Sequence, residues 1–190
     1  MIILGIDPGL SLTGWGVVEA FSRDKVNPLQ YGCIKTMPSV PLIQRLQTIN
    51  TKLQSVIDKY KPEVASIEEL FFFKATKSIA AVGQTRGAII LTASLNKIPL
   101  FEYNPKSVKT ALTGYGSADK YQMQRIVKTF LRLKEIPKPD DAADALAIAV
   151  CHVNTINWNA NNNNNASVFL KNKVFKESAK PNLLKKLFSL

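Results

Sequence analysis

Four acidic residues stand where carboxylates from different parts of a fold can meet. Asp7 and Glu68 each follow a short apolar run, and Asp141 and Asp144 are three residues apart, hence on one face of a helix. If they converge, each like-charge pair near 4 Å costs about 4 kcal/mol at an effective dielectric of about 20. Such a cluster needs protons or cations, and its oxygen ligands favour Mg²⁺ or Mn²⁺, two of which can promote phosphodiester cleavage. Taken singly, each acid also fits an ordinary role as a helix cap or strand end.

The elements that would carry these acids follow from the apolar pattern. Short apolar or β-rich runs bounded by Pro, Gly or charged residues predict five strands: Ile2 to Ile6, Trp15 to Val18, Tyr31 to Lys35, Val64 to Ile67 and Pro99 to Tyr103. The polar stretch Ser22 to Asn27 suits a hairpin, so the first strands are expected to pair antiparallel. A strand, helix, strand order after them predicts a parallel crossover and therefore an α/β fold with a mixed sheet.

Helical spacing of apolar residues, a largely apolar run and an Ala-rich run after Pro139 together predict five helices. They cover residues 42–60, 78–95, 107–112, 120–133 and 140–153. In the second helix Gly83 and Gly87 are one turn apart, which allows another backbone to approach; we favour packing against the core there, with a subunit interface as the alternative. The last helix starts after Pro139, and Asp140 is interpreted as its cap. Glu69 and the single histidine, His152, are assigned surface or packing roles.

Charge and composition limit the function classes. The chain has 190 residues and a net charge of +11, which points to a polyanionic partner. The start of the sequence does not resemble a secretory signal, no apolar run is long enough to cross a membrane, and two cysteines suit a reducing compartment, so a cytoplasmic location without membrane contact is expected. An Asn-rich tract follows residue 156. We therefore predict a folded domain over 1–156 and a linker with a basic, disordered tail over 157–190, which carries +5.

Several motifs, in order, resemble the RuvC crossover junction endodeoxyribonucleases of the ribonuclease H-like group. The motifs are Gly5 to Gly9 with Thr13 and Gly14, Ile67 and Glu68 followed by Phe71, Phe101 to Lys109, Gly114 to Lys120, and Asp141 to Ala145. The resemblance covers roughly residues 1 to 153. It implies a ribonuclease H-like mixed five-stranded sheet flanked by helices, and a homodimer that resolves four-way (Holliday) DNA junctions by paired symmetric nicks in recombination and repair.

The same resemblance implies roles for individual residues. The family's four catalytic, metal-binding carboxylates fall on Asp7, Glu68, Asp141 and Asp144, with Mg²⁺ as cofactor, two ions per subunit, and Mn²⁺ as a substitute. Phe71 matches an aromatic residue that stacks on a base near the junction centre. Lys109 and Lys120 match basic positions that contact DNA. The branch-migration proteins RuvA and RuvB are implied as partners.

Other functions remain open at this point. One alternative is another ribonuclease H-like nuclease that acts on RNA or on other DNA structures. An actin-like ATPase also opens with Asp and a Gly-rich hairpin, but it needs a second phosphate loop, which is not visible in the sequence. Wider phosphate contacts are assigned to five basic residues: Lys74, Lys77, Arg86, Lys106 and Arg125.

Overall fold

Five strands form one mixed sheet in the order β3-β2-β1-β4-β5. The computed structural model describes residues 1–69, 77–156 and 158. Its strands are β1 (Ile2–Asp7), β2 (Leu12–Ala20), β3 (Val26–Lys35), β4 (Val64–Glu68) and β5 (Leu100–Tyr103). β1, β2 and β3 pair antiparallel, whereas β4 pairs parallel with β1 and β5 pairs parallel with β4. The predicted α/β fold with a mixed five-stranded sheet is confirmed.

β3 is longer than its sequence pattern predicts. It begins at Val26 rather than Tyr31, and its first residues pair with the end of β2. Much of this strand lies at intermediate or full exposure, so the alternation of apolar and polar residues that marks a half-buried strand is weak there. The predicted polar connection is therefore shorter than Ser22 to Asn27.

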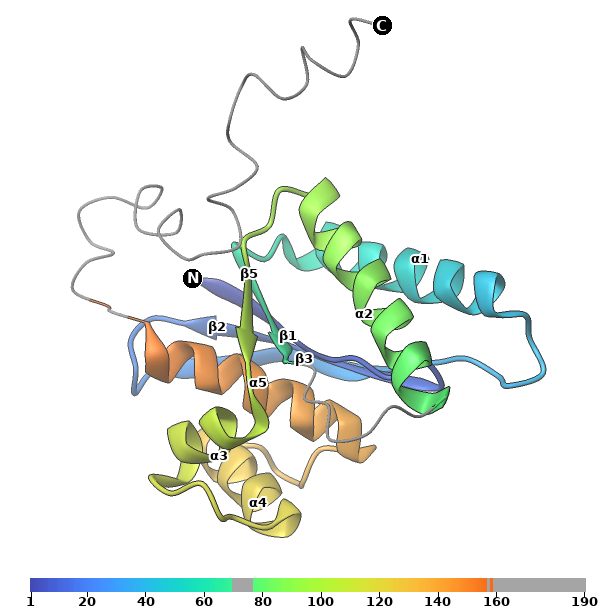
Figure 1. Ribbon diagram of the computed structural model, residues 1–190. Helices are drawn as coiled ribbons and strands as arrows, with labels where there is room; N and C mark the ends of the chain where they lie inside the picture. The colour runs from blue at the N-terminus through green and yellow to red at the C-terminus, as the bar shows by residue number, and fades with distance from the viewer. Residues whose placement is uncertain (70–76, 157, 159–190) are drawn as a thin grey trace, which may run out of the picture. The chain divides into compact units, whose positions relative to one another are not determined.

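The helices form two layers on the sheet. They are α1 (Leu42–Tyr60), α2 (Lys77–Leu95), α3 (Pro105–Thr113), α4 (Lys120–Phe130) and α5 (Asp140–Thr155). α1 and α2 pack together on one side of the sheet, while α5 lies on the other side with α3 and α4 against it (Figure 1). Apolar side chains of α1, including Ile49 and Leu53, are fully buried with Leu4 and Ile67 of the central strands. These layers hold β1 and β4 rigidly at the centre of the molecule.

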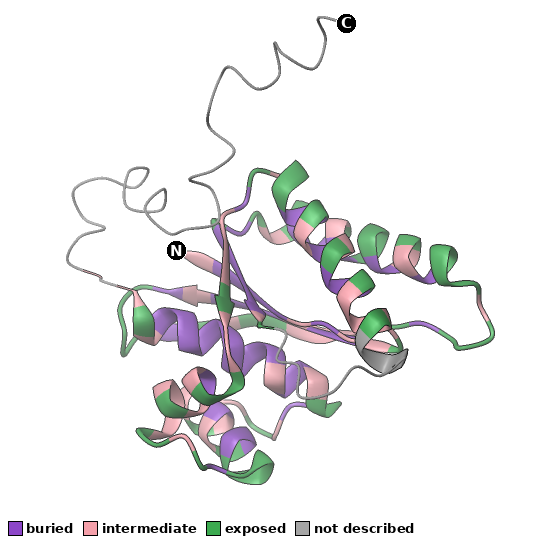
Figure 2. Cartoon of the chain, in the orientation of Figure 1, coloured by how far each residue is buried: buried purple, intermediate pink, exposed green. Residues whose placement is uncertain are grey.

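α5 is almost completely buried, as Figure 2 shows by its purple ribbon. Small residues at the contact let the helix lie close to the sheet. A side chain at Gly5 of β1 would collide with the carbonyl oxygen of Ala145, and one at Gly14 of β2 would collide with the carbonyl oxygen of Asp141. The absence of a Cβ at Gly5 and Gly14 therefore sets the depth at which α5 docks.

Gly83 and Gly87 correct the interpretation of α2. Apart from the backbone of α2 itself, a Cβ added at either glycine would meet no atom of the described residues within 4 Å, so neither position packs against the described core. Leu91 and Leu95, one and two turns further along, are 59% and 73% exposed. This face of α2 is open in the single chain, and the favoured prediction of core packing is wrong.

Residues Met1–Ile156 form one compact unit. The predicted linker and tail at 157–190 lie outside the described residues, apart from Trp158, and remain a prediction. None of the helices within the described ranges combines the length and hydropathy that a membrane crossing requires.

Candidate active site

The ends of β1 and β4 bring two acidic residues side by side. These strands are parallel neighbours, with Ile6 paired to Ile67, so Asp7 and Glu68 leave the same edge of the sheet in adjacent positions. Ser66 of β4 donates hydrogen bonds to the carbonyl oxygens of Leu4 (3.5 Å) and Ile148 (3.4 Å), which links both strands to α5. Asp7 and Glu68 line a cavity of about 220 Å³.

α5 supplies the other two acids. Asp144, in the second turn, lines the same cavity as Asp7 and Glu68. Asp141 is one turn earlier, where its backbone lies against Gly14, and it is not among the residues that line the cavity. Its charge nevertheless contributes to the raised pKa of Asp7, so it lies within electrostatic range of the others. The structure brings three predicted carboxylates into one cavity and the fourth to its border.

Burial and mutual repulsion make these carboxylates reluctant to ionise. Burial, followed by the charges of Glu68, Asp144 and Asp141, raises the pKa of Asp7 from 3.8 to about 7. Burial and the charge of Asp144 raise the pKa of Glu68. Burial also raises the pKa of Asp144, although Lys120 opposes this effect. The site thus concentrates negative charge that calls for cationic compensation.

Two lysines provide part of that compensation. Lys109 of α3 and Lys120 of α4 line the cavity. The Lys120 ammonium lies 3.4 Å from Asp144 Oδ2 and 3.2 Å from Asp140 Oδ2, and it is 57% exposed. Partial burial works against its protonation, but the hydrogen bond to Asp140 and the charge of Asp144 raise the pKa of Lys120 overall. Lys120 is therefore a charged group at the mouth of the cavity.

Asp140 has a different role from the predicted one. The N-cap of α5 is Pro139, and no side chain caps that helix end. Asp140 instead pairs with Lys120, and hydrogen bonds from Lys120 and Gln124 lower its pKa. The interpretation of Asp140 as a helix cap is wrong, because the lysine at the start of α4 offers it a charged partner.

The donor set fits a hard divalent cation. Every acidic side chain at the cavity offers carboxylate oxygens, which are the ligands preferred by Mg²⁺ and Mn²⁺. Burial is the largest cause of the raised pKa of Asp7, and the charges of Glu68, Asp144 and Asp141 raise it further against the opposing effect of Lys120. In the described part of the chain, no three His, Cys, Asp or Glu side chains are grouped as tightly as around a bound metal. The chemistry of the donors, rather than a preformed coordination shell, is what fits the cation.

Tyr103 and His152 connect two elements of the site, and the buried position of His152 agrees with the packing role assigned to it. The Tyr103 hydroxyl on β5, in register with Glu68, lies 2.8 Å from His152 Nδ1 on α5. His152 is fully buried against the Phe101 ring, and burial lowers its pKa to about 4, so it is neutral at physiological pH. This contact ties the strand beside Glu68 to the helix that carries Asp144. Only the aromatic residue at the end of β5 hinted at it in the sequence.

Cys33 also lies near the site. It is paired with Gly14 across the β2 and β3 ladder, and burial and the charge of Asp141 raise the pKa of its thiol to about 11. It is therefore an un-ionised neighbour of the acids.

The remaining predictions for single residues have mixed outcomes. Phe71 and Lys74 lie outside the described residues, as does the side chain of Lys77. Arg86 is buried, and its guanidinium lies 2.6 Å from Glu102 Oε2, so the predicted phosphate contact at Arg86 is wrong. Glu69 is exposed, as expected of a surface neighbour.

A mixed sheet in this strand order, with acids at the ends of its two central parallel strands and on the helix packed across them, defines a ribonuclease H-like nuclease. The sequence profile described as crossover junction endodeoxyribonuclease RuvC matches residues 3–152. The chain belongs to the RuvC family. It is a crossover junction endodeoxyribonuclease that resolves Holliday junctions in DNA recombination and repair. This decides against a nuclease specific for RNA or for other DNA structures.

Individual relatives agree with this assignment. RuvC of Desulforamulus reducens is 50% identical over 152 residues, which cover 80% of this chain and 93% of that protein. RuvC of Fusobacterium nucleatum is 41% identical over 192 aligned residues, 98% of this chain and 100% of that protein. The solved structure of T. thermophilus RuvC in complex with a Holliday junction substrate has a TM-score of 0.77 and 37% identity, covering 80% of this chain and 92% of that one.

Proposed function

We propose that four carboxylates bind the metal and carry catalysis in this junction endonuclease: Asp7, Glu68, Asp141 and Asp144. The observation that carries the proposal is the cavity at which β1, β4 and α5 each contribute an acid and α3 and α4 each contribute a lysine. A phosphodiester entering it would meet clustered carboxylates and two cationic groups. A merely structural set of acids would not be held together at the cost that the raised pKa of Asp7 implies.

The carboxylates would hold two Mg²⁺ ions per subunit, which Mn²⁺ can replace. The family is metal-dependent, and bound ions of this type supply charge stabilisation at the phosphate and a more acidic water molecule. The protein contributes position: Asp7 and Glu68 are fixed by strand pairing, and Asp144 by the buried α5. Strand pairing and the buried helix thus fix the backbone at these acids before the substrate arrives.

The lysines have complementary roles on the substrate. Lys120 would exchange its ion pairs with Asp140 and Asp144 for a contact with the scissile phosphate, where its charge stabilises the transition state. Lys109 would bind a neighbouring phosphate from the wall of the cavity. Phe71, in a segment beyond the described residues, would stack on a base near the junction centre, a contact worth about 1 to 3 kcal/mol.

A homodimer would place two such sites on one junction. The open face of α2 supports this arrangement, because Gly83 and Gly87 leave room for a second backbone and exposed Leu91 and Leu95 extend the apolar strip. A two-fold dimer matches a junction with two equivalent strands to cut. Gly87→Arg should yield a folded monomer by sedimentation and circular dichroism, and it should uncouple the two nicks. A dimer of unchanged stability would contradict this interface.

RuvA and RuvB would be the partners of the dimer at the junction, and the cytoplasm its location. The support is the family membership, and co-sedimentation of the three proteins on a four-way junction tests the association. If RuvA and RuvB do not change the binding of this chain to the junction, the partnership is contradicted.

A comparison of substrates tests the function itself. A mobile four-way junction, a linear duplex of the same sequence and an RNA:DNA hybrid are incubated with the full chain and Mg²⁺, with and without chelator. We expect ligatable paired nicks in the junction only, and none with chelator. Equal cleavage of the duplex or the hybrid would refute junction resolution.

A further inference from the structure

The positive charge of the folded chain is concentrated in one segment. Residues 105–138, which include α3 and α4, have eight Lys and Arg residues against Asp119 and Glu135, a net charge of +6. The rest of residues 1–150 has eleven basic and eleven acidic residues, so it carries no net charge. Lys109 and Lys120 account for only two of the eight basic residues. The field of this segment is thus larger than the active site alone requires.

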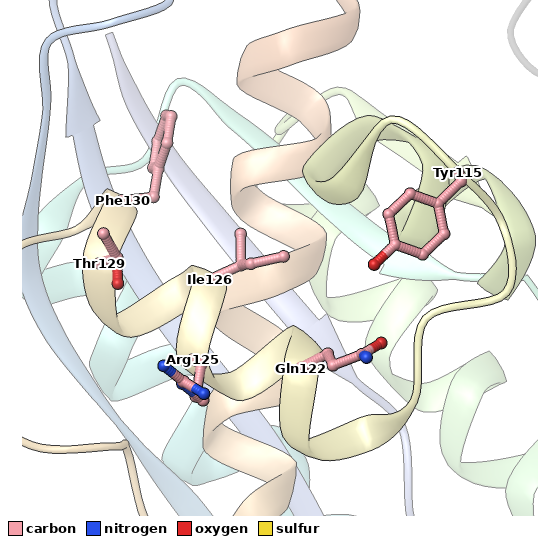
Figure 3. A pocket seen from close by; sticks show the side chains of 6 residues that line it. All are labelled: Tyr115, Gln122, Arg125, Ile126, Thr129 and Phe130. Atoms are coloured by element: carbon pink, nitrogen blue, oxygen red, sulfur yellow. The ribbon is translucent and has the colours of Figure 1, made fainter.

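The outer side of α4 in this segment is hollowed. A groove of about 450 Å³ is lined by Tyr115, Gln122, Arg125, Ile126, Thr129 and Phe130. Figure 3 shows Tyr115 extending from the connection between α3 and α4 towards the side chains of α4. We call this surface the α4 groove. Its apolar and aromatic lining, with one arginine among it, suits a ligand that is both flat and anionic.

Tyr115 and Arg125 line the α4 groove, and Tyr121 lies beside Arg125 on the same helix. Tyr115 and Tyr121 are 50% and 61% exposed, so both rings are accessible to a ligand. The backbone amide of Tyr115 donates a hydrogen bond of 3.1 Å to Thr113 Oγ1, which fixes the connection. Arg125 lies 5.8 Å from the Tyr121 ring and forms no ion pair with any acid among the described residues. Its charge is available to a ligand.

The α4 groove has a fixed distance from the catalytic cavity. Lys120 and Met123 line that cavity, whereas Gln122 and Arg125 line the groove, so the two surfaces are separated by no more than the width of one helix. A helix with its side chains is about 10 to 12 Å across, and a DNA strand advances about 3.4 Å per nucleotide. The groove is therefore about three nucleotides from the scissile phosphate.

We propose that the α4 groove binds the junction strand about three nucleotides from the cut, with Arg125 on a phosphate and Tyr115 packed against the adjoining sugar and base. The charge favours DNA over the other candidates. The tail of this chain has six lysines and only Glu177 and would be repelled, whereas the rest of residues 1–150 of a second copy, with no net charge, offers no attraction comparable to that of a phosphate backbone. The proposal rests on junction cleavage by this chain, which the substrate comparison above tests separately.

Binding of the full chain to a four-way junction in chelator, which stops cleavage, tests the proposal. Between about 50 and 200 mM salt, Arg125→Gln should reduce the slope of log K against log salt by about 0.9, the value of one phosphate contact. Tyr115→Ala should weaken binding about 5-fold or more. The matched controls are Arg23→Gln and Phe21→Ala, which remove exposed side chains outside residues 105–138 and should match wild type.

Neutral phosphates locate the contact on the DNA. Methylphosphonate is placed at one position at a time along the cleaved strand. Wild type should lose affinity at a position about three nucleotides from the cut, and Arg125→Gln should be insensitive at that position only, which is the signature of a coupled pair. Equal slopes for Arg125→Gln and wild type, or a loss unrelated to phosphate position, would overturn the proposal, as would unchanged junction binding by Tyr115→Ala.

Discussion

The Asp7 carboxylate should lower the free energy of unfolding of the metal-free protein. Asp7→Asn should therefore be more stable than wild type. Burial and the three neighbouring acids raise the pKa of Asp7 from 3.8 to about 7. An acid whose pKa is higher in the folded state holds its proton more tightly there than in the unfolded state. Stability is therefore lost as pH rises from 3.8 towards 7, and the full loss is present above pH 7.

The magnitude follows from linkage. At about 1.36 kcal/mol per pH unit, the penalty is about 2 kcal/mol at pH 5 and about 4 kcal/mol at pH 8. Asp7→Asn removes the titrating group and should therefore stabilise the metal-free protein, more at pH 8 than at pH 5. The pKa values of Glu68 and Asp144 are raised as well, so the comparison is between variant and wild type at each pH rather than between pH values.

Urea unfolding in chelator, followed by circular dichroism at both pH values, measures the difference. Asp24→Asn, which changes an exposed acid in the connection between β2 and β3, is the control and should shift stability by less than about 0.5 kcal/mol. Added Mg²⁺ should stabilise wild type more than Asp7→Asn, because binding to the folded state adds to its stability. An Asp7→Asn protein that is less stable than wild type at pH 8, or a difference independent of pH, would refute the reasoning.

Two further predictions concern the frame of the site and the tail. Gly5→Ala should destabilise the protein by about 1 to 3 kcal/mol in urea unfolding, because the new Cβ meets the carbonyl oxygen of Ala145. Lys52→Ala, at an exposed position of α1, should shift stability by less than about 0.5 kcal/mol, and equal effects would contradict the docking of α5. Deletion of residues 157–190 should leave cleavage intact but weaken DNA binding at low salt, because five net positive charges are lost. An unchanged affinity and salt slope would show that the tail does not contact DNA.

The sequence predicts most of the fold because its signals are local. The apolar runs that end at Asp7 and Glu68 mark buried parallel strands, and the spacing in α1 and α5 marks helices. The same signals place Asp7, Glu68 and Asp144 at one edge once the strand order is known. The sequence therefore predicts that these three acids lie at one edge of the sheet, without giving the distances between them.

Other features depend on contacts between distant residues. The sequence predicts that Asp140 caps α5, because it does not show that Lys120, twenty residues earlier, lies beside it in the fold. The sequence pattern marks Arg86 as a surface cation, and only the folded chain shows that it is buried and paired with Glu102. His152 gives no signal of its contact with Tyr103, because a buried histidine and an exposed one look alike in a sequence.

The surroundings of the two glycines of α2 also depend on residues that are distant in the sequence. Spacing one turn apart shows that a backbone can approach, but not whether that backbone belongs to the same chain. The open space at both positions decides against packing within the chain, and the exposed leucines beside them favour a second subunit.

Single-turnover cleavage of a four-way junction tests the central claim, that the four acids form one metal-binding catalytic centre. Each acid is changed alone, in Asp7→Asn, Glu68→Gln, Asp141→Asn and Asp144→Asn, and compared with Asp24→Asn at saturating Mg²⁺. Loss of a residue that only hydrogen-bonds to a metal ligand slows a metal enzyme by up to roughly 100-fold. Each of the four variants should reduce the cleavage rate by more than this, while junction binding is largely retained. A variant of any of the four that cuts at the wild-type rate would contradict the account.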